Sequence, residues 1–271
     1  MKIIIKFSKV GSMKFIGHLD LMRYFQKCFR RANVPIAMSK GFSPHQILSF
    51  ASPLGVGVTS EGDYLDAMLD TEDESYINKL KEDLNEVLND EIRVVEIRRV
   101  ADEVKSSMSL LCACDYVIGL KDVKVNEENK VLLNKDFIKA KLKCYLSQPE
   151  ILVTKKTKKS TKEINIKDYI YTITESVSAL SEYTGLSYDN ILESTSDSKA
   201  VIALRVTAGS SINIKPELIM EDFVKFLNIE YSNLEYQIHR LNMYRDKNFK
   251  KGELHTLNTE IICDPVAIYE Y

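Results

Sequence analysis

KFIGHLDLMRYFQKCFRRANVPIAMSKGFSPHQILSFASPLGVGVTSEGDYLD, residues 14–66, contains the first amphipathic helix of the chain and most of its chemically informative side chains. A helix from about residue 18 to residue 32 is predicted because apolar residues recur at spacings of four, three and four positions. These residues are Leu21, Phe25, Cys28 and Ala32. Pro35 ends the helix, since a residue that precedes proline disfavours helical backbone.

The segments around this helix have the order of an α+β domain. Four strands are expected, near residues 2–10, 46–52, 62–70 and 92–100. A second helix is expected over residues 71–89, where Thr71 and Glu74 have the spacing of a capping box. The resulting order, β-α-β-β-α-β, predicts a ferredoxin-like (split βαβ) domain at residues 1–104.

Residues 105–250 repeat this order of elements without a matching repeat in sequence. Strands are expected at residues 115–120, 199–207 and 234–245, and helices at residues 135–147 and 216–227. A long hairpin at residues 150–174 and a polar segment at residues 175–198, which resembles an insertion, lie between these elements. We therefore predict a second ferredoxin-like domain with an insertion, followed by a C-terminal tail at residues 251–271.

Charge is unevenly distributed along the chain. Residues 1–60 hold nine Lys or Arg residues and one acidic residue, Asp20, although the net charge of the whole chain is only −2. Such segregation creates a local positive field and predicts an anionic partner, with nucleic acid as the leading candidate. The alternative is that basic segments pair with acidic neighbours in the fold, since residues 61–104 hold fifteen acidic and five basic residues.

Cysteine usage and hydropathy restrict the class of protein. Five irregularly spaced cysteines cannot form a closed disulfide framework, and the chain begins with no signal-peptide pattern. We therefore expect a cytoplasmic protein with no membrane contact. Cys112 and Cys114 lack further ligands at metal-site spacing, and the chain has no C-x-x-x-C-x-x-C motif. No metal and no cofactor are therefore expected, and the chain cannot itself carry the usual radical-SAM cluster.

Three polar residues at the ends of adjacent elements are candidates for a central cluster. His18, Asp20 and His45 could bind a metal, hold a phosphate or act as an acid and a base. The simpler alternative is that Asp20 stabilises the start of the helix through its dipole.

Residues 39–45 have the composition of a loop. Gly41 can adopt a positive φ angle and expose backbone N–H groups, Lys40 adds a positive charge, and Phe42 could stack on a base. The alternative is a tight turn in which Phe42 is buried. The remaining residues expected to line a site here are Ser39, Ser43, Pro44 and Glu61.

Basic residues fall on the first helix, on this loop and on the tip of the second-half hairpin. Those expected to contact phosphate groups are Lys14, Arg23, Lys27, Arg30, Arg31, Lys40, Lys155, Lys156, Lys158, Lys159 and Lys162. The hairpin lysines have an alternative role, because lysines at a sheet edge also protect it from aggregation.

The motifs in these segments resemble those of the uncharacterised bacterial radical-SAM-linked proteins. That family has a K-x-G…RFISHLD segment, an Arg-rich helix, a YS-x-GFNPHP loop and an SE-x-EYLD segment. The matching residues here are Lys9 to Gly11, Lys14 to Asp20, Arg30 to Ala32, Ser39 to His45 and Leu54 to Asp66. The chain departs from the family pattern at Gly17, Ser43, Gln46 and Asp63, where Ser, Asn, Pro and Glu are usual.

Members of that family are encoded beside, or fused to, a cobalamin-binding-type radical SAM protein. The resemblance therefore implies a radical SAM partner, and the charge pattern suggests that this chain handles RNA. The leading hypothesis is an RNA-binding accessory protein for modification of tRNA or rRNA. Two alternatives are an enzyme that uses His18, Asp20 and His45, and a protein-interaction subunit that binds the radical SAM partner without RNA.

Overall fold

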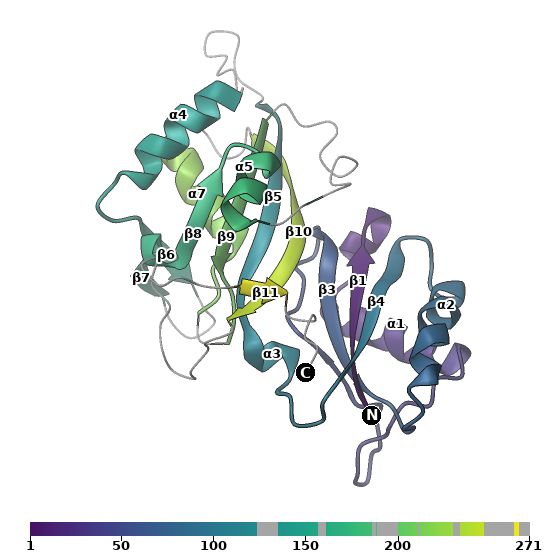
Figure 1. Ribbon diagram of the computed structural model, residues 1–271. Coiled ribbons are helices and arrows are strands. Elements are labelled where there is room, and N and C mark those ends of the chain that lie inside the picture. Colours follow the sequence, from purple (N-terminus) through teal and green to yellow (C-terminus); the bar gives the residue numbers. More distant parts are fainter. Residues whose placement is uncertain are drawn as a thin grey trace. The chain divides into compact units, whose positions relative to one another are not determined.

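The computed structural model describes residues 1–123, 135–156, 161–185, 188, 200–210, 212–229, 234–246 and 263–265, and Figure 1 shows their helices and strands. The protein belongs to the α+β class, as predicted, and its backbone contacts divide it into two compact units. Of the described residues, unit 1 contains 1–112, 242–246 and 263–265, and unit 2 contains those between 113 and 241. No helix among these residues is long and apolar enough to cross a membrane.

The strands of unit 1 are arranged around its first strand. Strand β1 (Lys2–Lys9) lies between β3 (Thr59–Met68) and β4 (Ile92–Val100) and is antiparallel to both. The short strand β2 (Leu48–Phe50) pairs antiparallel with β3. The order of these strands is therefore β4-β1-β3-β2.

Two helices cover one face of these strands. Helix α1 (His18–Arg31) and helix α2 (Ser75–Val87) share one core cluster with alternate residues of β1. The cluster includes Ile3, Ile5, Phe7, Leu21, Phe25, Cys28, Phe29, Leu80 and Leu84. Since alternate residues of a strand point to the same side, both helices pack on the same face of the sheet.

Helix α1 is nearly as the apolar spacing predicts. It ends at Arg31, and Leu21, Phe25 and Cys28 are buried as expected. Ala32 is the half-buried C-cap and packs against the core cluster, and Phe29 completes the buried face. Position 29 reaches the core because a globular helix buries a stripe wider than a strict heptad seam.

The turn that leads into α1 depends on one carboxylate. Residues Gly11–Phe15 form a 3₁₀ helix, η1, and Gly11 has a φ angle of 56°. Glu91 accepts hydrogen bonds from the backbone N–H of Ser12 at 2.9 Å and of Met13 at 3.0 Å, and from the Ser12 hydroxyl at 2.6 Å. These bonds lower the pKa of Glu91. A Cβ atom on Gly11 would lie 2.1 Å from the Glu91 carboxylate, so only glycine fits without displacing it.

Unit 2 is built from four main strands. Strand β9 (Ala200–Thr207) lies between β5 (Leu111–Val123) and β8 (Ile170–Thr174) and is antiparallel to both. Strand β10 (Leu234–Asp246) lies next to β5, which gives the order β10-β5-β9-β8. The helices of this unit are α4 (Lys135–Leu146), α5 (Val177–Thr184) and α7 (Pro216–Phe226).

The remaining elements are short. Helix α3 (Ser107–Leu110) precedes β5, and a 3₁₀ turn, η2 (Lys167–Tyr169), precedes β8. Strand β11 (Cys263–Pro265) pairs antiparallel with β10, with Tyr244 opposite Pro265. The rest of the expected C-terminal tail lies outside the described residues.

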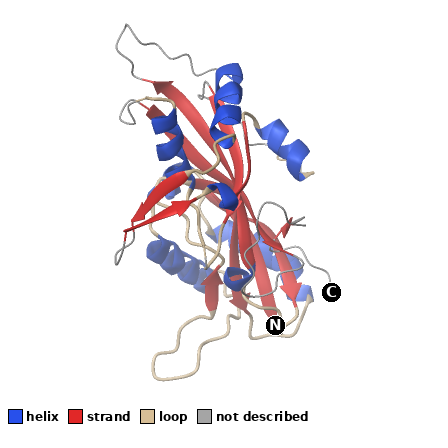
Figure 2. Cartoon of the chain, turned by 90° about the vertical axis from the view of Figure 1, so that its left-hand side faces the viewer, coloured by secondary structure: helices blue, strands red, loops and turns tan. Residues whose placement is uncertain are grey.

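Two local predictions are wrong. The expected hairpin at residues 150–174 is shorter. Among the described residues, β6 (Leu152–Lys156) pairs only with β7 (Thr161–Asn165), in a two-stranded sheet that Figure 2 shows apart from the other strands of unit 2. The expected capping box is absent, because α2 begins at Ser75, where Asp73 accepts the bond from the Ser75 backbone N–H at 3.0 Å. Thr71 instead accepts a hydrogen bond from the backbone N–H of Asp73.

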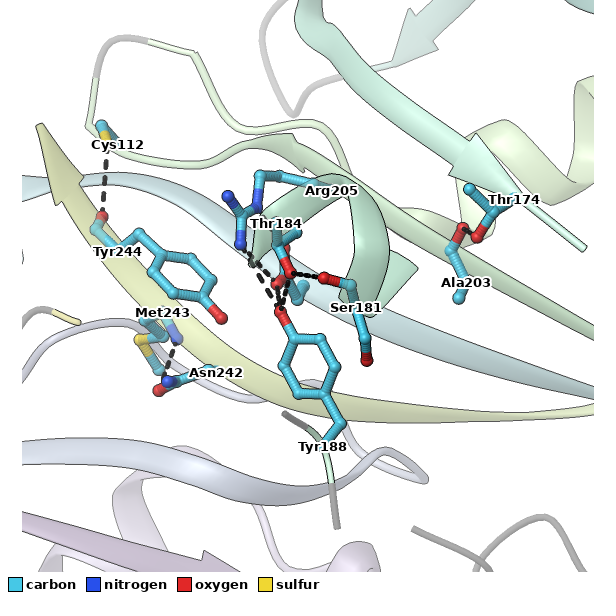
Figure 3. A network of polar contacts seen from close by, with 11 residues as sticks. Cys112, Thr174, Ser181, Thr184, Tyr188, Ala203, Arg205, Asn242, Met243 and Tyr244 are labelled. Atoms are coloured by element: carbon cyan, nitrogen blue, oxygen red, sulfur yellow. Dashed lines mark hydrogen bonds and ion pairs between the residues drawn. The ribbon is translucent and has the colours of Figure 1, made fainter. Parts of the chain in front are cut away.

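A buried ion pair joins β5 and β9 within unit 2. Arg205 donates two hydrogen bonds to Asp115, from Nε at 2.7 Å and from Nη2 at 2.8 Å. The Tyr188 hydroxyl also donates to Asp115, and Figure 3 shows its ring directed toward the Arg205 guanidinium. Both charged side chains are almost fully buried, so each requires the other for compensation.

Gly11→Ala is predicted to destabilise the protein by about 1–2 kcal/mol, because a side chain at this φ angle is strained and also displaces Glu91. Gly57→Ala is a matched control, since Gly57 has a φ angle of 87° but open space around it. Urea denaturation should therefore show a larger decrease in stability for Gly11→Ala than for Gly57→Ala. Equal midpoints for the two variants would contradict the role assigned to Glu91.

Candidate functional site

The exposed face of α1 carries most of the basic residues expected to bind phosphate. Arg23, Lys27 and Arg30 are exposed, opposite the buried stripe of the same helix. Arg23 pairs with Asp20 at 3.2 Å, and both side chains are about two-thirds exposed, so this pair contributes little stability. Lys27 and Arg30 form no ion pair with any described residue, and their charges therefore remain available to a partner.

Arg31 is exposed but partly engaged within unit 1. Its Nη2 donates to the Val87 carbonyl oxygen at 2.7 Å and to the Cys28 sulfur at 3.1 Å. The interaction with Cys28 raises the pKa of Arg31. Arg31 therefore links the end of α1 to the end of α2.

A loop at residues 39–45 follows α1 and is closed by its own polar groups. The Ser39 backbone N–H donates to the His45 carbonyl oxygen at 2.8 Å, and the His45 N–H donates to Ser39 Oγ at 3.0 Å. Ser39 Oγ also lies 2.8 Å from His45 Nδ1. These contacts hold the His45 ring through Nδ1 and leave Nε2 without a partner among the described residues.

The tip of this loop is fully exposed, and Figure 1 shows it as a purple segment that extends beyond the strands of unit 1 near the N-terminus. Phe42 is completely exposed, so it does not occupy a buried turn. Gly41 has a φ angle of 121° and open space around it. Lys40 and Ser43 are also exposed, so the tip presents an aromatic ring beside a positive charge.

A cavity of about 360 Å³ lies between α1 and the base of the loop. Its polar lining consists of Gln26, Arg30, His45 and Gln46. Its apolar walls consist of Val34, Ile36, Met38 and Pro44. The fold thus brings together three of the predicted site residues, Arg30 from α1 and Pro44 and His45 from the loop.

The two glutamines of this cavity were not among the predicted site residues. The position of Gln26, one helical turn before Arg30, could have indicated that it lies at the same site. The sequence singles out Gln46 only because the resembled family usually has Pro at this position. The Gln46 side chain is 9% exposed, and its Oε1 atom has no hydrogen-bond partner among the described residues. An unpaired buried oxygen is costly to the stability of the fold.

The structure does not group His18 and Asp20 with His45 as a set of metal ligands. His18 is half-buried with its ring edge against Phe50, at 5.3 Å between ring centres. Gln26, which lines the cavity with His45, follows His18 by eight positions, a rise of about 12 Å along a helix. Within the described part of the chain, no three His, Cys, Asp or Glu side chains are grouped so as to hold a metal ion.

The other predicted residues of unit 1 lie at separate places. Lys14 is half-buried, with Nζ 5.2 Å from the centre of the Phe15 ring. Glu61 is half-buried on β3, where its charge raises the pKa of Lys6 against the larger lowering caused by burial. The charge of Glu61, on β3, therefore influences Lys6 on the paired strand β1.

The end of the family-like motif in β3 has structural contacts. Asp63, Tyr64 and Asp66 are buried. The Tyr64 hydroxyl, whose pKa is raised by burial, donates to Asn242 Oδ1 at 2.6 Å. Asp66 accepts a hydrogen bond from the Ser107 backbone N–H at 2.8 Å. These two hydrogen bonds join β3 to β10 and to the start of α3 within unit 1.

Only part of the lysine-rich hairpin can be placed. Lys162 is exposed on β7, opposite Lys155 of β6. Lys158 and Lys159 lie outside the described residues, as does the side chain of Lys155, and Lys156 is placed only through its backbone pairing with Thr161.

Ser39→Ala removes the hydroxyl that contacts both the backbone N–H and the ring of His45. Each such hydrogen bond contributes about 0.5–1.5 kcal/mol to the stability of the folded state. Amide hydrogen exchange should therefore become faster at residues 39–46 and remain unchanged in α1. Unchanged exchange in the loop would show that these bonds do not hold it.

Comparison with protein-family models shows which family the chain is related to. Residues 2–216 match the model of DUF2344, described as "Uncharacterized protein conserved in bacteria". A search of the curated proteins finds no match. The matched residues include α1, the loop at residues 39–45 and the cavity between them. Since the match covers most of the chain, this protein belongs to the uncharacterised bacterial family DUF2344.

Proposed function

We propose that this protein binds RNA through α1 and the loop at residues 39–45, as an accessory to a radical SAM enzyme that modifies tRNA or rRNA. The observation that carries the RNA-binding proposal is the completely exposed ring of Phe42. It stands beside Lys40, on a loop closed by its own hydrogen bonds. The radical SAM partner is inferred from the family resemblance alone.

The physical basis of this proposal is the combination of aromatic and cationic groups. Stacking of a base on an exposed aromatic side chain contributes about 1–3 kcal/mol and tolerates any base. Lys27 and Arg30 on α1 have no described ion pair and could neutralise phosphate groups. Unpaired RNA offers both splayed bases and a phosphate backbone, and therefore fits the two kinds of group together.

The exposure of apolar side chains in unit 1 supports an alternative role, in protein interaction. Phe15, Leu19 and Val56 are each more than 60% exposed in unit 1, and exposed apolar groups of this size also occur at protein contacts. A radical SAM partner with an acidic patch could bind them together with the basic face of α1. A catalytic role for His18, Asp20 and His45 is supported by no grouping of their side chains.

We also propose that residues 1–104 and 105–250 are two ferredoxin-like domains. Their strand orders, β4-β1-β3-β2 and β10-β5-β9-β8, support this assignment. In the second domain the β6–β7 hairpin and α5 would be insertions into the β-α-β-β-α-β order.

Binding to single-stranded RNA 12-mers should weaken as salt rises, because phosphate contacts release counterions. The double variant Lys27→Glu/Arg30→Glu should lower the slope of log affinity against log salt by about 0.7 for each phosphate interaction that it removes. The matched control Lys79→Glu/Lys81→Glu makes the same change of charge on exposed positions of α2.

Fluorescence anisotropy over a salt series measures both slopes, with thermal melting as a check on folding. Equal slopes and affinities for the wild type and the α1 variant would contradict RNA binding at this surface. Salt-sensitive binding to the radical SAM partner that RNA does not affect would instead select the protein-interaction role.

A further inference from the structure

The cavity between α1 and the base of the loop is lined by hydrogen-bond donors and by no acidic side chain. Its described lining contains the amide of Gln26, the guanidinium of Arg30 and the imidazole of His45, and it includes no Asp or Glu. Most of the remaining lining is apolar. Because no carboxylate in the lining offsets the charge of Arg30, the cavity favours an anionic ligand.

Two of these donors come from one face of α1. Gln26 and Arg30 lie four positions apart on the helix, so their side chains are neighbours. Neither side chain forms a hydrogen bond or an ion pair with another described residue. Both are therefore available to a ligand, and a guanidinium can donate two parallel hydrogen bonds to a single oxyanion.

His45 supplies the third donor from a ring that the loop holds in place. Ser39 Oγ lies 2.8 Å from Nδ1 of this ring and accepts the His45 backbone N–H at 3.0 Å. The opposite ring nitrogen, Nε2, has no partner among the described residues. A phosphate at Nε2 would select the ring state with a proton there, since the Ser39 hydroxyl can then donate to Nδ1.

We propose that this cavity binds a phosphate monoester through Gln26, Arg30 and His45. A terminal phosphate carries nearly two negative charges at pH 7 and three acceptor oxygens, whereas a phosphodiester inside a strand carries a single charge and continues on both sides. The volume of about 360 Å³ lies at the lower end of the range for small-molecule sites. It suits a phosphate together with part of the group attached to it, which the apolar side chains would contact.

The phosphate could belong to the end of an RNA strand or to a free nucleotide. The first source rests on the proposed RNA-binding function, and the second does not. Arg30 belongs both to the exposed face of α1 and to this cavity, and it follows Lys27 by three positions. An RNA strand whose end enters the cavity would therefore also reach the proposed phosphate-binding face.

The test measures equilibrium binding of two sets of ligands to the full chain. The first set is a labelled RNA 12-mer with a phosphate at its 5′ end, at its 3′ end or at neither end. The second set is adenosine 5′-monophosphate and adenosine. Binding should favour the terminally phosphorylated ligand in at least one set by about tenfold or more, as expected of hydrogen bonds to a charged group.

The variants separate this site from general attraction between charges. Gln26→Leu/Arg30→Lys keeps the net charge but removes the amide and the guanidinium fork, and should reduce the preference below about threefold. His45→Leu is a second variant at an exposed position, and it should also lower the preference. The control Lys27→Gln removes an exposed charge outside the cavity lining, so it should weaken binding of all 12-mers by a similar factor and keep the preference. Thermal melting checks that each variant is folded.

The outcomes distinguish this site from the proposed RNA binding. A preference within either set that both cavity variants lower would support the site, and the set concerned would identify the source of the phosphate. Salt-sensitive RNA binding with no preference in either set would overturn the site and leave RNA binding intact, and so would a preference that both cavity variants retain. Preference for the nucleotide without binding of any strand at low salt would overturn RNA binding alone. Absence of binding by every ligand would overturn both.

Discussion

The packing of α1 against β1 is the interaction on which the rest of unit 1 depends. Phe7, Phe25 and Phe50 meet edge to face, with ring centres 4.9 to 5.9 Å apart. Such pairs contribute about 0.5–1.5 kcal/mol each beyond the burial of apolar area. Because the three rings come from β1, α1 and β2, they fix the rotation of the helix and the position of the chain that follows the loop.

That rotation determines where the charged and polar groups lie. With the apolar stripe of α1 on the sheet, Lys27 and Arg30 must face outward, and Gln26 must border the space beside the loop. The same helix thus supplies both the proposed phosphate-binding face and one wall of the cavity. The loop supplies the rest, since the Ser39–His45 contacts hold its base while the tip remains exposed.

The sequence predicted what local periodicity controls and missed what tertiary contacts control. The limits of α1 follow from its apolar spacing, whereas α2 begins at Ser75, where Asp73 and not Thr71 accepts the hydrogen bond from the Ser75 backbone N–H. The loop could be predicted from its composition, and its exposure could not. The expected grouping of His18 with His45 failed because His18 packs on Phe50 at the start of α1, whereas His45 lines the cavity with Gln46.

The most direct test of this account is amide hydrogen exchange of the full chain with and without a bound RNA 12-mer. It reports which backbone segments become protected, independently of any substitution. The account predicts protection at residues 34–46 and in α1, with α2 unchanged. Protection confined to α2 or to unit 2, at RNA concentrations that saturate binding, would contradict it.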